Sequence, residues 1–291
     1  MAETKPAFNL TDWLVNAALR GIIGAALLLP YAMRVRASGW LFSRILSPLA
    51  GYHRRIRDNL AMIVPDMPAD EVARLMRAVP DNVGRTLIEI YSGAEFIKHV
   101  TSTALSGPGL AALDAAHAAN RPVILVTGHF GNYDASRAAL IARGYPVGAL
   151  YNPMSNRYFN SHYVNAMASI GTPLFARGKP GLAGMVKFLR GGGMLGLLID
   201  QRMHKGEKLS FFGHDALTAL SAATLALKYD ALVVPTYGVR RDNGLDFDII
   251  IEAPIPHGPP EAMTQALNDS LEAIVRQHMD QWFWIHRRWK G

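Results

Sequence analysis

The sequence predicts an α/β fold in which a mostly parallel sheet is flanked by helices and preceded by an N-terminal membrane-associated helix. Two observations predict this fold. From residue 121 onward, short apolar runs alternate with helical segments, as in parallel sheets covered on both faces. Before residue 41 lies an apolar block with flanking tryptophans and following arginines. We therefore expect an anchor over residues 1–40 and one globular domain over residues 41–291.

The N-terminal apolar block covers residues 14–33, with Arg20 inside it and Pro30 near its end. Its uninterrupted part is shorter than the roughly 20 residues that a membrane span needs. The block either spans a membrane with Arg20 reaching back to the surface or lies in the interface. Trp13 and Trp40 flank it, which favours a membrane segment over the alternative of an ordinary buried helix. A signal peptide fits less well, since no A-x-A-like cleavage site follows.

Charge in the N-terminal part of the chain also favours a membrane. The formal net charge is +7, which indicates an anionic partner. Between Trp13 and Arg57 there is no acidic residue but there are seven arginines: Arg20, Arg34, Arg36, Arg44, Arg54, Arg55 and Arg57. If the block spans, the arginines directly after it keep the following domain cytoplasmic. No nucleic-acid-binding motif is visible, so we expect a membrane partner and no nucleic acid.

The remaining elements are expected in a regular order. Helical stretches end near Pro65 and cover residues 68–99, where Pro80 is a candidate break, and a further helix covers residues 110–119. The expected strands cover residues 122–127, 146–151, 172–175, 194–199, 232–237 and 247–252. The expected helices between and after them cover residues 135–143, 157–169, 181–190, 217–228 and 260–284.

The sharpest motif is TGHFGNYD at residues 127–134, between an expected strand and an expected helix. Catalytic groups in α/β sheets gather at the carboxyl ends of strands, where His129 lies. Gly128 and Gly131 allow a sharp turn. Asp134 is placed to cap the helix and to orient the imidazole of His129, which together would form a general base. The alternative is that Asp134 only caps the helix and His129 only fills a turn.

The chain has no cysteine and no G-x-S-x-G motif. A thiol nucleophile, disulfides and a serine nucleophile of the hydrolase type are therefore not expected. The simplest reaction that a histidine base supports is direct attack of an acceptor hydroxyl on an activated acyl group. The ten histidines show no metal-binding spacing, so we expect no metal.

The HX4D motif formed by His129 and Asp134 resembles that of the lysophospholipid acyltransferase superfamily, in particular its lipid A biosynthesis (lauroyl/myristoyl) acyltransferase branch. Further similar segments follow in the expected order: RDNL at 57–60, RG at 177–178, DQ at 200–201, FFG at 211–213 with Thr218, and QWFWIHRRWK at 281–290. Together these cover roughly residues 10 to 290.

The resemblance implies a lysophospholipid acyltransferase-like fold at a bacterial inner membrane, with the acyltransferase domain on the cytoplasmic face. It implies an acyl-thioester co-substrate, on acyl carrier protein or coenzyme A, no other cofactor, and a glycolipid or lysolipid acceptor such as a lipid A precursor. It also implies His129 as base and Asp134 as its partner. Lipid A enzymes commonly have Glu at this second position, whereas phosphatidylinositol mannoside acyltransferases have Asp, so that acceptor is an alternative.

Six further residues are expected to bind substrate. Arginines near strand ends suit phosphate, which their planar guanidinium recognises, although surface arginines are often only solvated. Asp200 and Gln201 end a nearly all-apolar strand, where the carboxylate binds an arginine or the acceptor hydroxyl, or forms a plain structural ion pair. The candidates are Asn132, Arg157, Arg177, Asp200, Gln201 and Arg202.

Two other functions are compatible with these residues. An acyl-thioester hydrolase would use the same histidine base, and a non-catalytic lipid-binding protein would use the arginines alone.

Three of the five tryptophans lie in the last ten residues, among His286, Arg287, Arg288 and Lys290. They indicate either a membrane interface or packing of the tail into the core.

Overall fold

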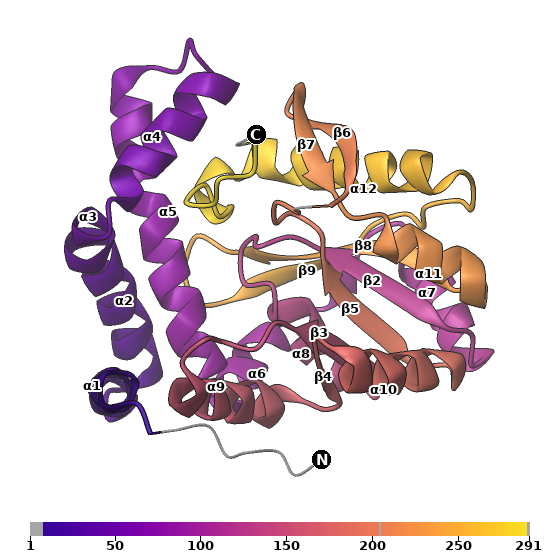
Figure 1. Ribbon diagram of the computed structural model, residues 1–291, viewed down its shortest axis with the longest axis horizontal. Helices are drawn as coiled ribbons and strands as arrows, with labels where there is room; N and C mark the ends of the chain where they lie inside the picture. Colours follow the sequence, from indigo (N-terminus) through magenta and orange to yellow (C-terminus); the bar gives the residue numbers. More distant parts are fainter. Residues whose placement is uncertain (1–7, 204, 290–291) are drawn as a thin grey trace.

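The computed structural model describes residues 8–203 and 205–289 (Figure 1). Residues 1–7 of the expected anchor and Lys290 of the tail therefore lie outside the described residues. The helices are α1 (Leu10–Leu27), α2 (Tyr31–Leu41), η1 (Phe42–Leu46), α3 (Ser47–Leu49), α4 (Tyr52–Ile63), α5 (Ala69–Ile90), α6 (Ala94–Val100), α7 (Leu110–Ala118), α8 (Ala135–Ile141), α9 (Arg157–Ile170), α10 (Lys179–Arg190), α11 (Ser221–Tyr229), α12 (Pro260–Gln277) and η2 (Met279–Gln281). The strands are β1 (Leu105–Ser106), β2 (Val123–Thr127), β3 (Val147–Tyr151), β4 (Leu174–Ala176), β5 (Met194–Leu198), β6 (Glu207–Phe211), β7 (His214–Thr218), β8 (Leu232–Arg240) and β9 (Phe247–Ile251).

Seven strands form one sheet in the order β1-β9-β8-β2-β5-β3-β4. Every neighbouring pair is parallel except β8 and β9, which are antiparallel. A separate hairpin consists of β6 and β7. The predicted α/β class with a mostly parallel sheet is therefore confirmed, and β2, which carries the motif at its end, lies at the centre of the sheet.

Both faces of the sheet are covered by helices, because alternate residues of each strand point to opposite faces. In β2, Val123 and Leu125 pack in one cluster with residues of α7, α8 and α9. Ile124 and Val126 pack in another with residues of α10, α11 and α12. All five residues of β2 are buried, as expected of a central strand in a doubly covered sheet.

Several boundaries differ from the prediction. The expected helix over residues 68–99 continues through Pro80 and ends at Ile90, before Gly93 with φ = +48°. The expected closing helix ends at Gln277, and the tail then returns to the sheet, with Trp282 bridging Phe130. The expected helix from residue 217 begins only at Ser221, since the preceding residues form β7.

The N-terminal apolar block forms two helices because Pro30 lies between α1 and α2. Within α1 only Asn16 and Ile23 are buried, which does not fit the alternative of an ordinary core helix. Among the described residues, α1 is the helix that is long and apolar enough to cross a membrane. Figure 1 shows α2, α3 and α4 on the far side of α5 from the sheet, and α5 packs against α2, η1 and α4.

Candidate active site

His129 lies in the turn that joins β2 to α8, directly after the carboxyl end of the central strand. This catalytic turn, residues 128–134, passes between β8 and Asp200, and two glycines make the passage possible. A Cβ on Gly131, which has φ = +53°, would lie 1.9 Å from the carbonyl oxygen of Gly238. A Cβ on Gly128 would lie 3.0 Å from Asp200 Oδ2. The positions of both glycines in the motif thus follow from close contacts of the backbone.

The carboxylate that binds His129 belongs to Asp200. β2 and β5 are parallel neighbours in which Thr127 is opposite Leu198, so the residues after both strands meet at the same edge. Asp200 Oδ1 lies 2.8 Å from His129 Nδ1, and Asp200 Oδ2 accepts a 2.7 Å bond from the backbone N–H of His129. The Asp200 side chain is 2% exposed and that of His129 is 23% exposed. A buried carboxylate therefore fixes an imidazole that still reaches solvent.

The pKa of Asp200 is lowered to about 2 by its surroundings. Burial alone would raise this pKa, but the charge of His129 and bonds from its ring, its backbone N–H and the Trp282 indole outweigh burial. Asp200 is consequently ionised at neutral pH. An ionised acceptor at Nδ1 selects the tautomer in which Nδ1 carries the proton and Nε2 is free to accept one.

The Nε2 atom of His129 faces Gln201, whose side-chain nitrogen is 3.4 Å away. Gln201 is exposed, so an incoming hydroxyl can take its place without disturbing the core. The ring of Tyr133 stands edge-on to the imidazole at 5.4 Å, and the ring of Phe283 lies 5.8 Å away. These two aromatic rings restrict the orientation of His129.

The C-terminal tail completes the site, and three of its residues were not predicted as site residues. Trp282 donates its indole N–H to Asp200 Oδ2 at 2.9 Å. Phe283 donates its backbone N–H to the carbonyl of His129 at 3.0 Å. His286 accepts the backbone N–H of Arg202 at 2.8 Å, and its pKa is lowered mainly by burial. Trp282 and Trp284 are buried, in agreement with core packing of the tail. No sequence spacing connects this tail to residue 129; the contact depends on the fold.

The expected contact between Asp134 and His129 is not present. Both carboxylate oxygens of Asp134 instead accept bonds from Arg137, at 2.6 and 3.1 Å. Arg137 also donates to the carbonyls of Met167 and Gly171, so the pair ties α8 to the end of α9. Asp134 is at the N-cap position of α8, as predicted, but its side chain makes no capping bond. The i,i+3 spacing to Arg137 on one helical turn explains this preference.

Asn132, expected to contact substrate, is fully buried and uses both ends of its side chain internally. Its amide nitrogen donates to Glu89 at 2.9 Å, and its amide oxygen accepts the backbone N–H of Asp134 at 3.0 Å. Its role in the structure is therefore to hold the catalytic turn in shape.

The three expected arginines lie at different distances from His129. Arg202 lies two residues after Asp200, and its Nε has no partner among the described residues. Arg177 is exposed after β4, and β5 and β3 lie between β4 and β2, which corresponds to about 14 Å. Arg157 begins α9 and donates to the Tyr158 hydroxyl at 2.8 Å. The structure thus brings Asp200, Gln201 and Arg202 to His129 and places Arg177 further along the edge.

The four backbone N–H groups from His129 to Asn132 are all engaged. Their acceptors, in chain order, are Asp200 Oδ2 and the carbonyls of Gly128, Gln281 and Gly238, at 2.7, 2.8, 2.9 and 3.3 Å. An oxyanion that forms beside His129 would therefore depend on side-chain donors.

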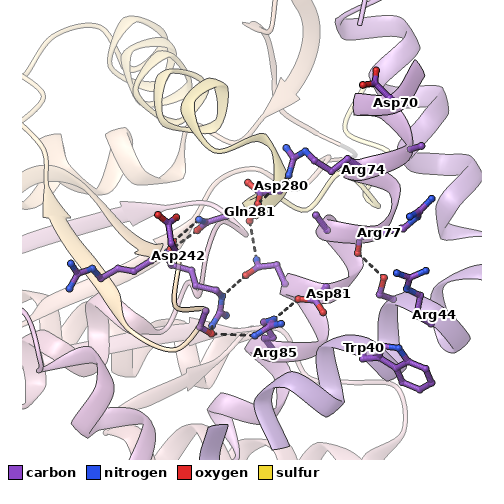
Figure 2. Close-up of a pocket in the computed structure, with 17 residues that line it drawn as sticks. Trp40, Arg44, Asp70, Arg74, Arg77, Asp81, Arg85, Asp242, Asp280 and Gln281 are labelled. Carbon is purple, nitrogen blue, oxygen red and sulfur yellow. Dashed lines mark hydrogen bonds and ion pairs between the residues drawn. The ribbon is translucent and has the colours of Figure 1, made fainter. Parts of the chain in front are cut away.

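The larger of two described cavities, of about 760 Å³, lies between α5, η1 and the loop after β8, and His129 does not line it. Figure 2 shows Arg74, Arg77 and Arg85 of α5 along one wall, with Asp280 and Gln281 opposite. A second cavity, of about 510 Å³, lies between α4 and the tail.

Within residues 8–203 and 205–289, no cluster of His, Asp and Glu could hold a metal ion.

Comparison with known proteins identifies the family. The chain is 24% identical over 217 residues to the lipid A biosynthesis acyltransferase of Haemophilus influenzae, a match that spans 74% of this chain and 64% of that relative. The match thus covers less than two thirds of the relative's length. Residues 4–291 match the bacterial lipid A biosynthesis acyltransferase family, which is nearly the whole chain. The chain therefore belongs to the bacterial lipid A biosynthesis acyltransferase family.

Proposed function

We propose that this protein transfers a fatty acyl chain from an acyl-thioester, carried on acyl carrier protein or coenzyme A, to a hydroxyl of a lipid A precursor or related membrane glycolipid. The observation that carries the proposal is the pair of His129 and the buried, ionised Asp200 at the carboxyl edge of the central strands. Membership of the family supports the same reaction.

In the proposed mechanism His129 is the general base and Asp200, in place of the expected Asp134, is its partner. His129 Nε2 removes the proton from the acceptor hydroxyl as its oxygen attacks the thioester carbonyl. Asp200 stabilises the imidazolium that forms. When the tetrahedral intermediate collapses, the carbon–sulfur bond breaks and the imidazolium returns its proton to the leaving thiolate. The products are an ester and a free thiol, and His129 is neutral again.

Gln201 and Arg202 are the proposed donors for the oxyanion of the intermediate. The backbone N–H groups beside His129 already have acceptors, which leaves side chains for this role. The amide nitrogen of Gln201 is 3.4 Å from His129 Nε2, and Arg202 is the residue directly after Gln201. Donors preorganised toward developing charge are the main source of such stabilisation.

The protein is proposed to bind an anionic bilayer through α1 and the surface formed by α2, η1, α3 and α4. This membrane-facing surface exposes large apolar side chains, namely Trp13, Leu14, Leu19, Ile22, Leu28, Met33, Trp40, Ile45, Leu46, Leu49 and Met62. Exposed arginines, including Arg36, Arg44, Arg54 and Arg57, accompany them. Apolar residues that enter the interface together with cations that meet anionic headgroups are typical of membrane-bound helices. A lipid acceptor would reach the site from this bilayer.

Mass spectrometry of membrane lipids tests the function. Cells that lack the protein are complemented with wild type, with His129→Gln or with the control His214→Ala, which changes an exposed histidine on the β6–β7 hairpin. We expect one glycolipid to lose one acyl chain in the deletion and with His129→Gln, and to recover it with the other two. Unchanged lipids with altered free fatty acid would instead indicate a thioesterase. No change in either would contradict catalysis by this site.

A further inference from the structure

A buried polar cluster connects α5 and β8 to the catalytic turn. Its members are Asn82, Thr86 and Glu89 of α5 and Arg240 at the end of β8. Glu89 is 0% exposed and Arg240 is 8% exposed, so the cluster contains a carboxylate and a guanidinium that are almost completely removed from water. None of these residues was predicted from the sequence to belong to the site.

Three bonds run from α5 into the turn. The carbonyl oxygen of Gly131 accepts the Asn82 amide and the Thr86 hydroxyl, both at 2.9 Å. Glu89 Oε2 accepts the side-chain amide of Asn132 at 2.9 Å. The two residues that are held, Gly131 and Asn132, follow His129 by two and three positions. Each bond therefore fixes the backbone that carries the imidazole.

Arg240 links the three residues of α5 to one another. It donates to both oxygens of Glu89, to Asn82 Oδ1 at 2.8 Å and to Thr86 Oγ1 at 3.4 Å. Its own backbone N–H donates to Gln281 Oε1 at 2.8 Å, in the tail that also carries Trp282. One charged group thus sets the orientation of every side chain that holds the turn from the α5 side.

A buried ion pair is a weak source of net stability, because desolvation opposes the attraction between the charges. Apolar residues of similar volume would fill the same space. They could not accept a hydrogen bond from the Asn132 amide or donate the hydrogen bond that orients Asn82. What the charged pair provides here, and apolar groups could not, is the fixed position of Gly131 and Asn132.

We infer that Glu89 and Arg240 are positioning residues for His129, which hold the catalytic turn in its reactive geometry without touching substrate. This inference rests on the acyl transfer proposed above. A shift of about 1 Å in a catalytic group can lower the rate about 100-fold, so small movements of the turn matter. Loss of the pair should lower kcat more than it changes KM, because the substrates do not contact these residues.

Two double variants separate positioning from stability. Glu89→Leu with Arg240→Met removes both charges and also the acceptor for Asn132. Glu89→Gln with Arg240→Met removes both charges but keeps a neutral acceptor for Asn132. A matched control is Asp81→Asn with Arg85→Met, which removes a neighbouring ion pair of α5 that lines the cavity and does not contact the turn (Figure 2).

In a transfer assay on purified protein in lipid vesicles, we expect Glu89→Leu with Arg240→Met to melt close to wild type but to lose about 10- to 100-fold in kcat, with KM changed less than about threefold. Glu89→Gln with Arg240→Met should recover a large part of kcat at a similar melting temperature. The control should keep wild-type kcat. If kcat instead follows melting temperature across all variants, or if Glu89→Leu with Arg240→Met keeps full kcat, the positioning role is wrong.

A readout without substrate keeps this test apart from the proposed function. NMR titration of the imidazole signals compares His129 with the exposed His214. We expect Glu89→Leu with Arg240→Met to shift or broaden the His129 signals and to leave those of His214 unchanged. If wild type transfers no acyl group but this change in the His129 signals is seen, the proposed acyl transfer is contradicted. The inference that Glu89 and Arg240 position His129 is then still supported. Unchanged His129 signals would overturn the positioning role whatever the reaction.

Discussion

Gly131 is the residue at which the catalytic turn meets the sheet. Its positive φ of +53° suits glycine, and its N–H donates to the carbonyl of Gln281. Its carbonyl oxygen accepts two bonds from α5. A single residue without a side chain thus joins three parts of the protein that are distant in sequence.

Gly131→Ala should therefore destroy the site. The new Cβ would lie 1.9 Å from the carbonyl oxygen of Gly238, so the turn has to move. We expect a loss of at least about 100-fold in transfer rate and a lower melting temperature. Gly258→Ala is the matched control, because nothing lies within 4 Å of the added Cβ, and it should behave as wild type. Equal rates for both variants would show that the turn does not need this contact.

At the residue scale, the sequence predicts His129 but not its partner. A glycine-flanked histidine after an apolar strand is a local pattern, and the structure places it as expected. The partner depends on which strand lies beside β2, and that strand is β5, 71 residues further along the chain. The pairing of Asp134 with Arg137 is local in sequence, but nothing in the spacing distinguishes it from a contact with His129.

Among the elements, the N-terminal helices carry most of the exposed apolar surface. Within residues 8–203 and 205–289, fourteen of the eighteen large apolar side chains that are exposed lie between Phe8 and Met62. α5 packs against α2, η1 and α4 of this surface and also carries the residues that hold the catalytic turn. The membrane-facing surface and the site are therefore connected through one helix.

Acidic substitutions on this surface should weaken membrane binding. Leu46 is 46% and Leu49 is 82% exposed, so changing both to Asp does not disturb the core. In sedimentation with vesicles that contain phosphatidylglycerol, we expect binding to fall at least about 10-fold, and higher salt to weaken wild-type binding because of the arginines. Leu182→Asp on α10, at a leucine that is 40% exposed, is the control. If the Leu46 and Leu49 variant binds like the control, this surface does not contact the bilayer.

The sequence predicts those strands that form clear runs of apolar residues. The six predicted strands correspond to β2, β3, β4, β5, β8 and β9, each a clear apolar run. The β6–β7 hairpin was missed because exposed polar residues, namely Glu207, Lys208, Ser210, His214 and Asp215, interrupt its apolar ones. The tail beyond Gln277 was predicted as helix, but its aromatic side chains pack around Phe211 and Phe212 and override that tendency.

The stability of the whole molecule depends on pH through two titratable residues near the site, Asp200 and His286. The folded-state pKa of Asp200 is about 2, below its value of 3.8 in the unfolded chain. Its contribution, on the order of 2 kcal/mol, is thus present above about pH 4 and is lost as the pH falls toward 2. The pKa of His286 is also lowered, so stability already begins to fall as the pH drops through the range where an unfolded histidine takes up a proton.

Urea unfolding between pH 7 and pH 3 checks this dependence. We expect the free energy of unfolding of wild type to fall steadily with acidification, and Asp200→Asn to show a smaller fall below pH 4. Asp230→Asn, at an exposed carboxylate, should follow the wild-type curve. If the free energy of unfolding depends on pH in the same way for all three proteins, the pKa of Asp200 is not lowered in the folded state.

The architecture of the whole molecule was the most predictable feature. Alternating strands and helices specify a parallel sheet with covered faces, and the carboxyl edge of such a sheet is where a site forms. The alternation of strands and helices does not predict that the tail returns to that edge and brings Trp282 to Asp200. That contact depends on tertiary packing and has no local sequence signal.

The most direct test of the account compares the two candidate partners of His129 in one transfer assay. Asp200→Asn keeps the size of the side chain but removes the charge that stabilises the imidazolium, so we expect kcat/KM to fall about 10²- to 10⁴-fold. Asp134→Asn breaks a buried pair with Arg137 and should lower stability by about 3–5 kcal/mol, while each folded molecule keeps a rate within about 10-fold of wild type. Wild-type activity in Asp200→Asn, together with inactive but folded Asp134→Asn, would contradict the account.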